Sequence, residues 1–178
     1  AKQAMDTAQM LYQDGHITYM RTDSPSLSGQ ASSAAIAAAK ELFGAESVAS
    51  APRMYGAKSK NAQEAHEAIR PSGEKFVHPD DLKTVLQGKS QLLYELIWRR
   101  TVASQMADAK LSTTTAKLQT EVDSKVAEFS ASGTVVLFRG FMAVYQEVQE
   151  EGKEPESAKL PALEVGTTIK IDEIASKD

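Results

Sequence analysis

The spacing of hydrophobic residues changes near residue 106. Before this point apolar residues recur every three or four positions, which is the period of a helix with one buried face. After it they alternate with polar residues, as in a strand with one face toward a core. The pattern therefore predicts an α+β protein, with a helical domain over residues 1–106 and a β-rich domain over 107–178.

The helical domain is predicted to contain three main helices and two short ones. The expected ranges are 2–14, 29–43, 62–69, Asp80 or Asp81 to Gly88, and 90–107, with an irregular connection over 45–62. Gly15 and Gly44 are the expected helix stops, and Ser28 is the expected cap of the second helix. The side chains expected to be buried in the last helix are Leu93, Leu96, Ile97, Val102, Ala103 and Met106, with Trp98 partly buried.

Three alternating runs make up the β-rich domain, over 116–122, 127–131 and 169–171. Asp123-Ser124 and Ser132-Gly133 are turn signals. Gly140 and the acidic stretch 147–156 are expected to lie in loops.

A short polar stretch between the first two helices, Ile17-Thr18-Tyr19-Met20-Arg21-Thr22-Asp23-Ser24, suggests chemistry. In an extended segment residues i and i+2 point the same way, so Tyr19 and Arg21 should share a face. A phenol can attack phosphorus, while a guanidinium orients the phosphate and offsets the charge that develops on it. Because a solvated strand shows the same spacing, the pair alone leaves both interpretations open.

The composition sets limits on the class of protein. Hydrophobic residues make up 42% and charged residues 25% of the 178 positions, as in ordinary soluble globular proteins. No apolar run reaches the length of a membrane span, and zero cysteines exclude disulfides and thiolate metal sites. The net charge of -4 divides into +1 over residues 1–105 and -5 over residues 106–178. An anionic ligand is therefore expected to bind to residues 1–105 rather than to the acidic second part. Both ends suggest a piece of a longer chain.

His66 lies in a second polar stretch, Gln63 to Pro71. His66-Glu67 begins a zinc-protease pattern, but Arg70 stands where the second histidine is required. On a helix Gln63, His66, Glu67 and Arg70 would share a face, which is also what a solvated surface shows. The sequence contains no nucleophile elbow, phosphate-binding glycine loop or acidic cluster spaced for Mg²⁺, and Asp80-Asp81 is expected to cap a helix.

Two stretches together, LYQDGHITYMRTDS (11–24) and NAQEAHEAIRPS (61–72), resemble the type IA DNA topoisomerases of bacteria. LYELIWRRTVASQMADA (93–109) is similar to the family's continuation, so the resemblance covers nearly the whole chain. It implies that the helical domain bears the active-site tyrosine and that the β-rich part belongs to the arch of these enzymes.

The resemblance also implies roles for individual residues. Tyr19 would be the nucleophile that becomes 5′-phosphotyrosyl-linked to a cut single strand, and Arg21 would contact the scissile phosphate. Supporting positions are Thr18, Thr22, Asp23, His66 and Gln9, and further DNA contacts would come from Arg70, Lys58 and Lys60. Gln13 departs from the glutamate expected at its position, so it is given no role.

The implied reaction is ATP-independent single-strand breakage, strand passage and resealing, which relaxes negatively supercoiled DNA. The implied cofactor is Mg²⁺, held by a Toprim domain absent from these residues, and no metal site is expected here. The expected partners are single-stranded or negatively supercoiled DNA and the remaining domains of the polypeptide. We expect a cytoplasmic, nucleoid-associated monomer without membrane contact, and a fragment inactive by itself.

A different class of function also fits the sequence, namely a non-catalytic module that binds single-stranded DNA. Its phosphate contacts would come from cationic residues of the first part, Arg53, Lys58, Lys60, Arg99 and Arg100.

Overall fold

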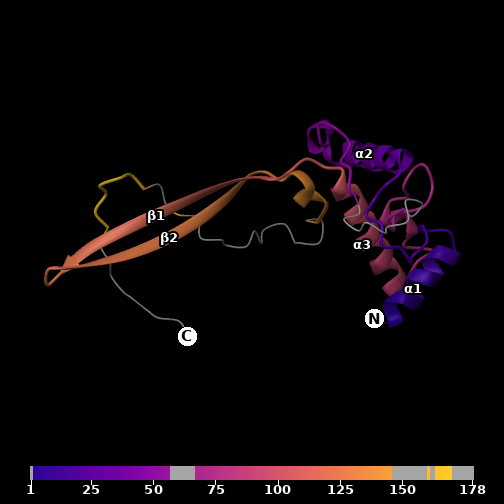
Figure 1. Ribbon diagram of the computed structural model, residues 1–178, viewed down its shortest axis with the longest axis horizontal. Coiled ribbons are helices and arrows are strands. Elements are labelled where there is room, and N and C mark those ends of the chain that lie inside the picture. Colours follow the sequence, from indigo (N-terminus) through magenta and orange to yellow (C-terminus); the bar gives the residue numbers. More distant parts are fainter. Residues whose placement is uncertain (1, 57–66, 146–159, 161–162, 170–178) are drawn as a thin grey trace. The chain divides into compact units, whose positions relative to one another are not determined.

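The computed structural model describes residues 2–56, 67–145, 160 and 163–169 (Figure 1). The chain forms two compact units. The helical unit comprises Ala1–Lys110 and Phe138–Glu150, and the hairpin unit comprises Leu111–Leu137 and Glu151–Asp178. Helices and a two-stranded sheet together confirm the α+β class. Within the described residues, no helix is both long and apolar enough to cross a membrane.

Helix α3 is the centre of the helical unit. It runs over Gly88–Ser104 and contacts two other helices, α1 (Lys2–Gln13) and α2 (Gly29–Phe43). The described residues also form three 3-10 helices, η1 (Ala45–Ser47), η2 (Pro79–Leu82) and η3 (Gly140–Tyr145). Helix α3 contacts η2 and η3. Since η3 follows the hairpin in the chain, the helical unit is built from two segments separated by the hairpin in the sequence.

The core of the helical unit combines small side chains of α2 with large ones of α3. Ala31, Ala35 and Ala39 are fully buried, and they share one cluster with Tyr94 and Trp98. Alanine leaves room for a neighbouring helix to approach closely, which explains how a thin apolar stripe is buried against large aromatic rings. The cluster also includes Leu11 of α1 and Ile17, so the first residue of the polar stretch is anchored in the core.

The hairpin consists of β1 (Lys110–Val122) and β2 (Lys125–Phe138). Asp123 and Ser124 join the strands with φ of 51° and 61°, the left-handed values that a tight two-residue hairpin loop requires. Side-chain hydrogen bonds show an antiparallel register centred on this turn: Thr113–Thr134, Thr115–Ser132 and Gln119–Glu128. Asp123-Ser124 is therefore confirmed as a turn.

Several local predictions are wrong. Ser132-Gly133 lies inside β2, Ile169 is in no strand, and residues 67–69 are not helical. A single 3-10 turn, η2, replaces the helix expected between Asp80 and Gly88, and His78 rather than an aspartate caps it. Leu96 is 53% exposed, while Tyr94 is 2% exposed. The apolar stripe of α3 runs through Tyr94, Trp98 and Val102, which lie in the core cluster together with the alanines of α2. Aromatic rings at these positions bury more surface than Leu96 would.

Candidate functional site

The polar stretch begins where α1 ends. Gly15 has φ of +77°, a conformation that glycine adopts without strain, and the His16 amide donates to the Leu11 carbonyl at 2.8 Å. Ile17 then enters the core, where it is 1% exposed. The sequence therefore turns sharply out of the helix and anchors the chain two residues before Tyr19.

Main-chain contacts bring together the two motifs that lie about 50 residues apart. They are an antiparallel bridge between Ile17 and Pro71, the Thr18 amide donating to the Arg70 carbonyl at 2.9 Å, and the Ser72 amide donating to the His16 carbonyl at 3.0 Å. A short two-stranded pairing thus joins residues 16–18 to residues 70–72. Each motif supplies one edge of the same local structure.

Tyr19 and Arg21 are both exposed, on either side of buried Met20. Tyr19 is 49% exposed within the described residues, so this residue is accessible to solvent. The Tyr12 ring, on the last turn of α1, meets the Tyr19 ring edge to face with centroids 5.3 Å apart. Of the other predicted positions, Gln9 is exposed on α1 and Asp23 is exposed after Arg21.

The threonines of the motif make local hydrogen bonds. The Thr18 hydroxyl donates to the Ala68 carbonyl at 2.9 Å and accepts from the Arg70 amide at 3.0 Å. The Thr22 hydroxyl accepts from the Ser24 amide at 3.1 Å, which turns the chain after Arg21. Thr18 therefore joins the two motifs, and Thr22 shapes the loop that follows.

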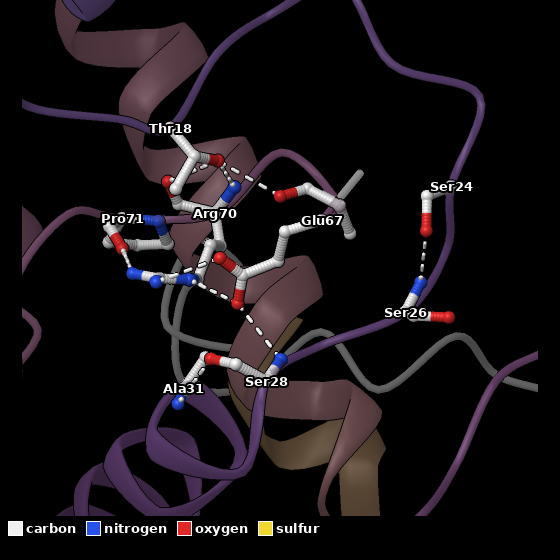
Figure 2. A network of polar contacts seen from close by, with 9 residues as sticks. Thr18, Ser24, Ser26, Ser28, Ala31, Glu67, Arg70 and Pro71 are labelled. Carbon is white, nitrogen blue, oxygen red and sulfur yellow. Dashed lines mark hydrogen bonds and ion pairs between the residues drawn. The ribbon is translucent and has the colours of Figure 1, made fainter. Parts of the chain in front are cut away.

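Glu67 and Arg70 of the second motif form a bidentate ion pair, shown together with Thr18 in Figure 2. Arg70 Nε and Nη2 donate to the two carboxylate oxygens of Glu67 at 2.9 and 3.0 Å, and Nη1 donates to the Pro71 carbonyl at 2.9 Å. Glu67 Oε1 also accepts from the Ser28 amide at 2.9 Å, at the start of α2. The ion pair therefore connects the second motif to the first turn of a core helix.

The charge on Glu67 is stabilised in spite of its partial burial. Burial raises the pKa of Glu67, but hydrogen bonds from Arg70 and Ser28 and the positive charge of Arg70 lower it more. The net pKa lies below the ordinary glutamate value, so this carboxylate is ionised at neutral pH. A fixed anion here keeps the Arg70 guanidinium paired.

The cationic residues predicted from the sequence fall into three groups. Lys58, Lys60 and His66 lie outside the described residues. Arg53 pairs with Asp108 at 2.9 Å, and Arg99 binds Glu95 at 2.6 Å and the Val144 carbonyl at 2.8 Å. Arg100 is exposed, and Arg70 is 9% exposed with its guanidinium held as described above. Three of these arginines, Arg53, Arg70 and Arg99, thus also have structural partners.

The sequence interpretation assigns no role to Tyr12 or Glu67, yet Tyr12 contacts the Tyr19 ring and Glu67 accepts from Arg70 and Ser28. For Glu67 a signal was present, since an acid and an arginine three residues apart can pair. For Tyr12 no local pattern predicts the contact, because it depends on the turn at Gly15 that folds the chain back beside α1.

Comparison with known proteins agrees with this geometry. The model of a family described as DNA topoisomerase matches residues 1–178. DNA topoisomerase 1 of Mycobacterium leprae is 47% identical over 175 residues, 96% of this chain and 18% of the relative. The same enzyme of Streptomyces coelicolor is 47% identical over 178 residues, 98% of this chain and 18% of the relative. The solved full-length topoisomerase I from Thermotoga maritima matches with a TM-score of 0.64 and 34% identity, over 85% of this chain and 24% of that one.

The chain therefore belongs to the DNA topoisomerase family, in its type IA class. Within this class it is similar to bacterial DNA topoisomerase I over nearly its whole length, so the resemblance drawn from the motifs is confirmed. The chain spans about a fifth of the length of these relatives.

Proposed function

We propose that this chain is the nucleophile-bearing part of an enzyme that cuts and reseals one DNA strand, with Tyr19 as the attacking residue. One observation carries the proposal. The two motifs are hydrogen-bonded to each other through residues 16–18 and 70–72, and Tyr19 follows this pairing directly with its ring half exposed. Exposure and a fixed backbone are what a nucleophile needs to reach phosphorus in a bound strand.

The proposed step exchanges one phosphodiester for another. The Tyr19 oxygen bonds to phosphorus, the bond to the 3′ oxygen of the preceding nucleotide breaks, and the leaving oxygen gains a proton as the phenol loses its own. Arg21 is proposed to hold the scissile phosphate and to offset the negative charge of the transition state. Because the bonds formed and broken are of one kind, resealing needs no ATP.

Supporting roles are proposed for the neighbouring polar residues. Thr18 and Thr22 hold the backbone on either side of Tyr19 and Arg21 through the hydrogen bonds described above. We propose that Gln9, Asp23 and His66 surround the phosphate, and that Lys58 and Lys60 contribute to the DNA-binding region. The DNA contact that the resemblance implies for Arg70 is not proposed, because its guanidinium donates to Glu67 and Pro71 and the residue is 9% exposed. Residues 1–106 are proposed as the tyrosine-bearing domain and 107–178 as part of the arch.

Mg²⁺ is proposed as a cofactor of the whole enzyme, bound outside this chain by a Toprim domain. The described residues contain no group of three His, Asp or Glu side chains placed to hold an ion. We accordingly propose that the isolated chain neither relaxes plasmid DNA nor cleaves single strands efficiently. The whole enzyme is proposed to act as a monomer on negatively supercoiled DNA in the bacterial cytoplasm, at the nucleoid.

The test replaces Tyr19 with Phe in a full-length enzyme that carries this segment. Wild-type enzyme incubated with single-stranded DNA and Mg²⁺ is expected to give a covalent protein–DNA adduct on a denaturing gel. Tyr19→Phe removes only the hydroxyl, so the adduct should disappear while DNA binding persists. Asp80→Asn, at an exposed side chain outside both motifs, is the control and should keep the adduct. An adduct that survives Tyr19→Phe contradicts the assignment.

A second candidate function is non-catalytic binding of single-stranded DNA. A groove of about 500 Å³ in the helical unit favours it, since its lining includes Arg53, Tyr55, Arg100, Phe141 and Tyr145. Aromatic rings can stack on bases while arginines meet phosphates. Fluorescence anisotropy of a labelled oligonucleotide with this chain should show binding that weakens as salt rises. Absence of binding at low salt contradicts a stand-alone binding role.

A further inference from the structure

We propose that Glu67 and Arg70 are positioning residues, whose ion pair sets the backbone that presents Tyr19. The proposal rests on the proposed function of Tyr19 as nucleophile. It gives this pair a role in the cleavage step itself, rather than in binding DNA.

Thr18 is the residue through which the ion pair reaches Tyr19. Its amide donates to the Arg70 carbonyl at 2.9 Å, and its hydroxyl accepts from the Arg70 amide at 3.0 Å and donates to the Ala68 carbonyl at 2.9 Å. All three bonds end on residues 68–70. Any change in the course of residues 68–70 therefore moves the peptide that precedes Tyr19.

Residues 67–70 lie in neither a helix nor a strand, and side-chain contacts add to the main-chain bonds that hold this segment. The Arg70 guanidinium closes the segment by binding both oxygens of Glu67 and the Pro71 carbonyl. The side chains of Arg70 and Glu67 are 11% and 27% exposed, so water competes little for these bonds. The planar fork of arginine fits a carboxylate in one orientation, which fixes the backbone at both ends of the segment.

The same carboxylate ties the segment to the core. The Ser28 amide donates to Glu67 Oε1 at 2.9 Å, and the Ser28 hydroxyl caps α2 by accepting from the Ala31 amide at 3.2 Å (Figure 2). Helix α2 is packed into the core through its buried alanines. The hydrogen bond from Ser28 therefore fixes the position of Glu67 relative to this helix. The contacts therefore run from α2 through Glu67 and Arg70 to Thr18 and the nucleophile.

The geometry favours positioning over a direct DNA contact for Arg70. Its Nε, Nη1 and Nη2 atoms each donate a hydrogen bond inside the protein, and the residue is 9% exposed. Arg21 differs in being exposed next to Tyr19. The two arginines are thus proposed to have different roles. Arg21 binds the scissile phosphate, and Arg70 positions the backbone before Tyr19.

The first experiment measures single-turnover cleavage in the full-length enzyme that carries this segment. Glu67→Gln keeps an acceptor for Ser28 but weakens the pair with Arg70, and Arg70→Lys keeps the charge but loses the fork. Misplacing a nucleophile by about 1 Å can cost about 100-fold, so each variant should form the adduct about 10- to 100-fold more slowly. The dissociation constant for uncleavable DNA should stay within about twofold, because neither side chain is proposed to contact the strand.

A second pair of variants isolates the bond to α2. Ser28 has φ of −63°, which suits proline, so Ser28→Pro removes the amide donor while Ser28→Ala keeps it; both lose the hydroxyl cap. Ser28→Pro should cleave more slowly than Ser28→Ala, at equal DNA affinity. Asp80→Asn, which breaks an exposed pair with Lys83 also three residues apart, is the control and should leave cleavage unchanged. Melting temperatures of all variants show whether each one folds.

The outcomes separate the two proposals. If the adduct does not depend on Tyr19, the proposed function fails and the positioning role fails with it. If the adduct depends on Tyr19 but Glu67→Gln and Arg70→Lys cleave at the wild-type rate, only the positioning role is overturned. It is also overturned if the variants lose DNA affinity as much as cleavage, or if Ser28→Pro and Ser28→Ala cleave equally fast.

Discussion

The ring of Tyr12 meets the ring of Tyr19 edge to face, with centroids 5.3 Å apart and planes inclined by 72°. Aromatic pairs of this geometry contribute about 0.5–1.5 kcal/mol beyond burial. Tyr12 lies on α1, whereas Tyr19 lies beyond the turn at Gly15. The contact therefore restrains the ring of the proposed nucleophile against α1.

Replacing Tyr12 with Ala should slow adduct formation in the full-length enzyme by up to about tenfold, since the Tyr19 ring loses its neighbour. Tyr12→Phe keeps the ring and should react at close to the wild-type rate. Single-turnover cleavage of a labelled oligonucleotide measures both. Equal rates for the Ala and Phe variants would show that the ring contact does not restrain Tyr19.

Stability of the helical unit should fall in acid partly through Glu67. The pKa of this carboxyl is lowered in the folded chain, because Arg70 and Ser28 more than offset the effect of burial. Its contribution is therefore complete above its ordinary value of 4.5 and is lost as pH falls through the lower, folded value. Urea unfolding between about pH 7 and pH 3 should show a shallower decline for Glu67→Gln than for wild type. An identical slope would mean that the ion pair does not contribute.

Stability in alkali should depend on Tyr94. Burial raises the pKa of Tyr94 to about 12, and its hydroxyl donates to the Val77 carbonyl at 2.8 Å. A raised value means that the contribution is complete below the ordinary tyrosine pKa of about 10 and is lost as pH rises toward the folded value. Tyr94→Phe should remove this decline of stability with rising pH. It should also lower the free energy of unfolding by about 1 kcal/mol at neutral pH, because the hydrogen bond to Val77 is lost. Chemical unfolding across alkaline pH tests it, with exposed Tyr12→Phe as the control.

Gly140 is the position where a single methyl group should be least tolerated. Its φ is +50°, and a Cβ there would lie 2.5 Å from the Ala107 carbonyl oxygen and 2.6 Å from the Asp108 carbonyl. Gly140→Ala should therefore destabilise by about 1–3 kcal/mol, because backbone atoms must move. Gly29→Ala, in the first turn of α2 with nothing within 4 Å, should be neutral or stabilise by about 0.4–1 kcal/mol. Thermal unfolding compares the two, and equal melting temperatures would contradict the expected clash.

Local features of the sequence predicted the elements that depend on neighbouring residues. Helix α2 has the range expected from its cap Ser28 and stop Gly44, because capping acts within one turn. The turn at Asp123-Ser124 follows from backbone preferences of short polar residues. Ser132-Gly133 carries a similar signal yet lies in β2, because pairing with the opposite strand outweighs a weak turn preference.

The sequence by itself determined the family, the two motifs and the exposed Tyr-Met-Arg alternation, since each is written in residues close together in the chain. Only the tertiary structure decided how the motifs meet. The pairing of Thr18 with Arg70, and of Glu67 with Ser28, joins residues 39 to 52 positions apart. Such contacts depend on where α2 and the core place each segment, and no local preference encodes that. The ion pair that supports Tyr19 is therefore a product of the fold.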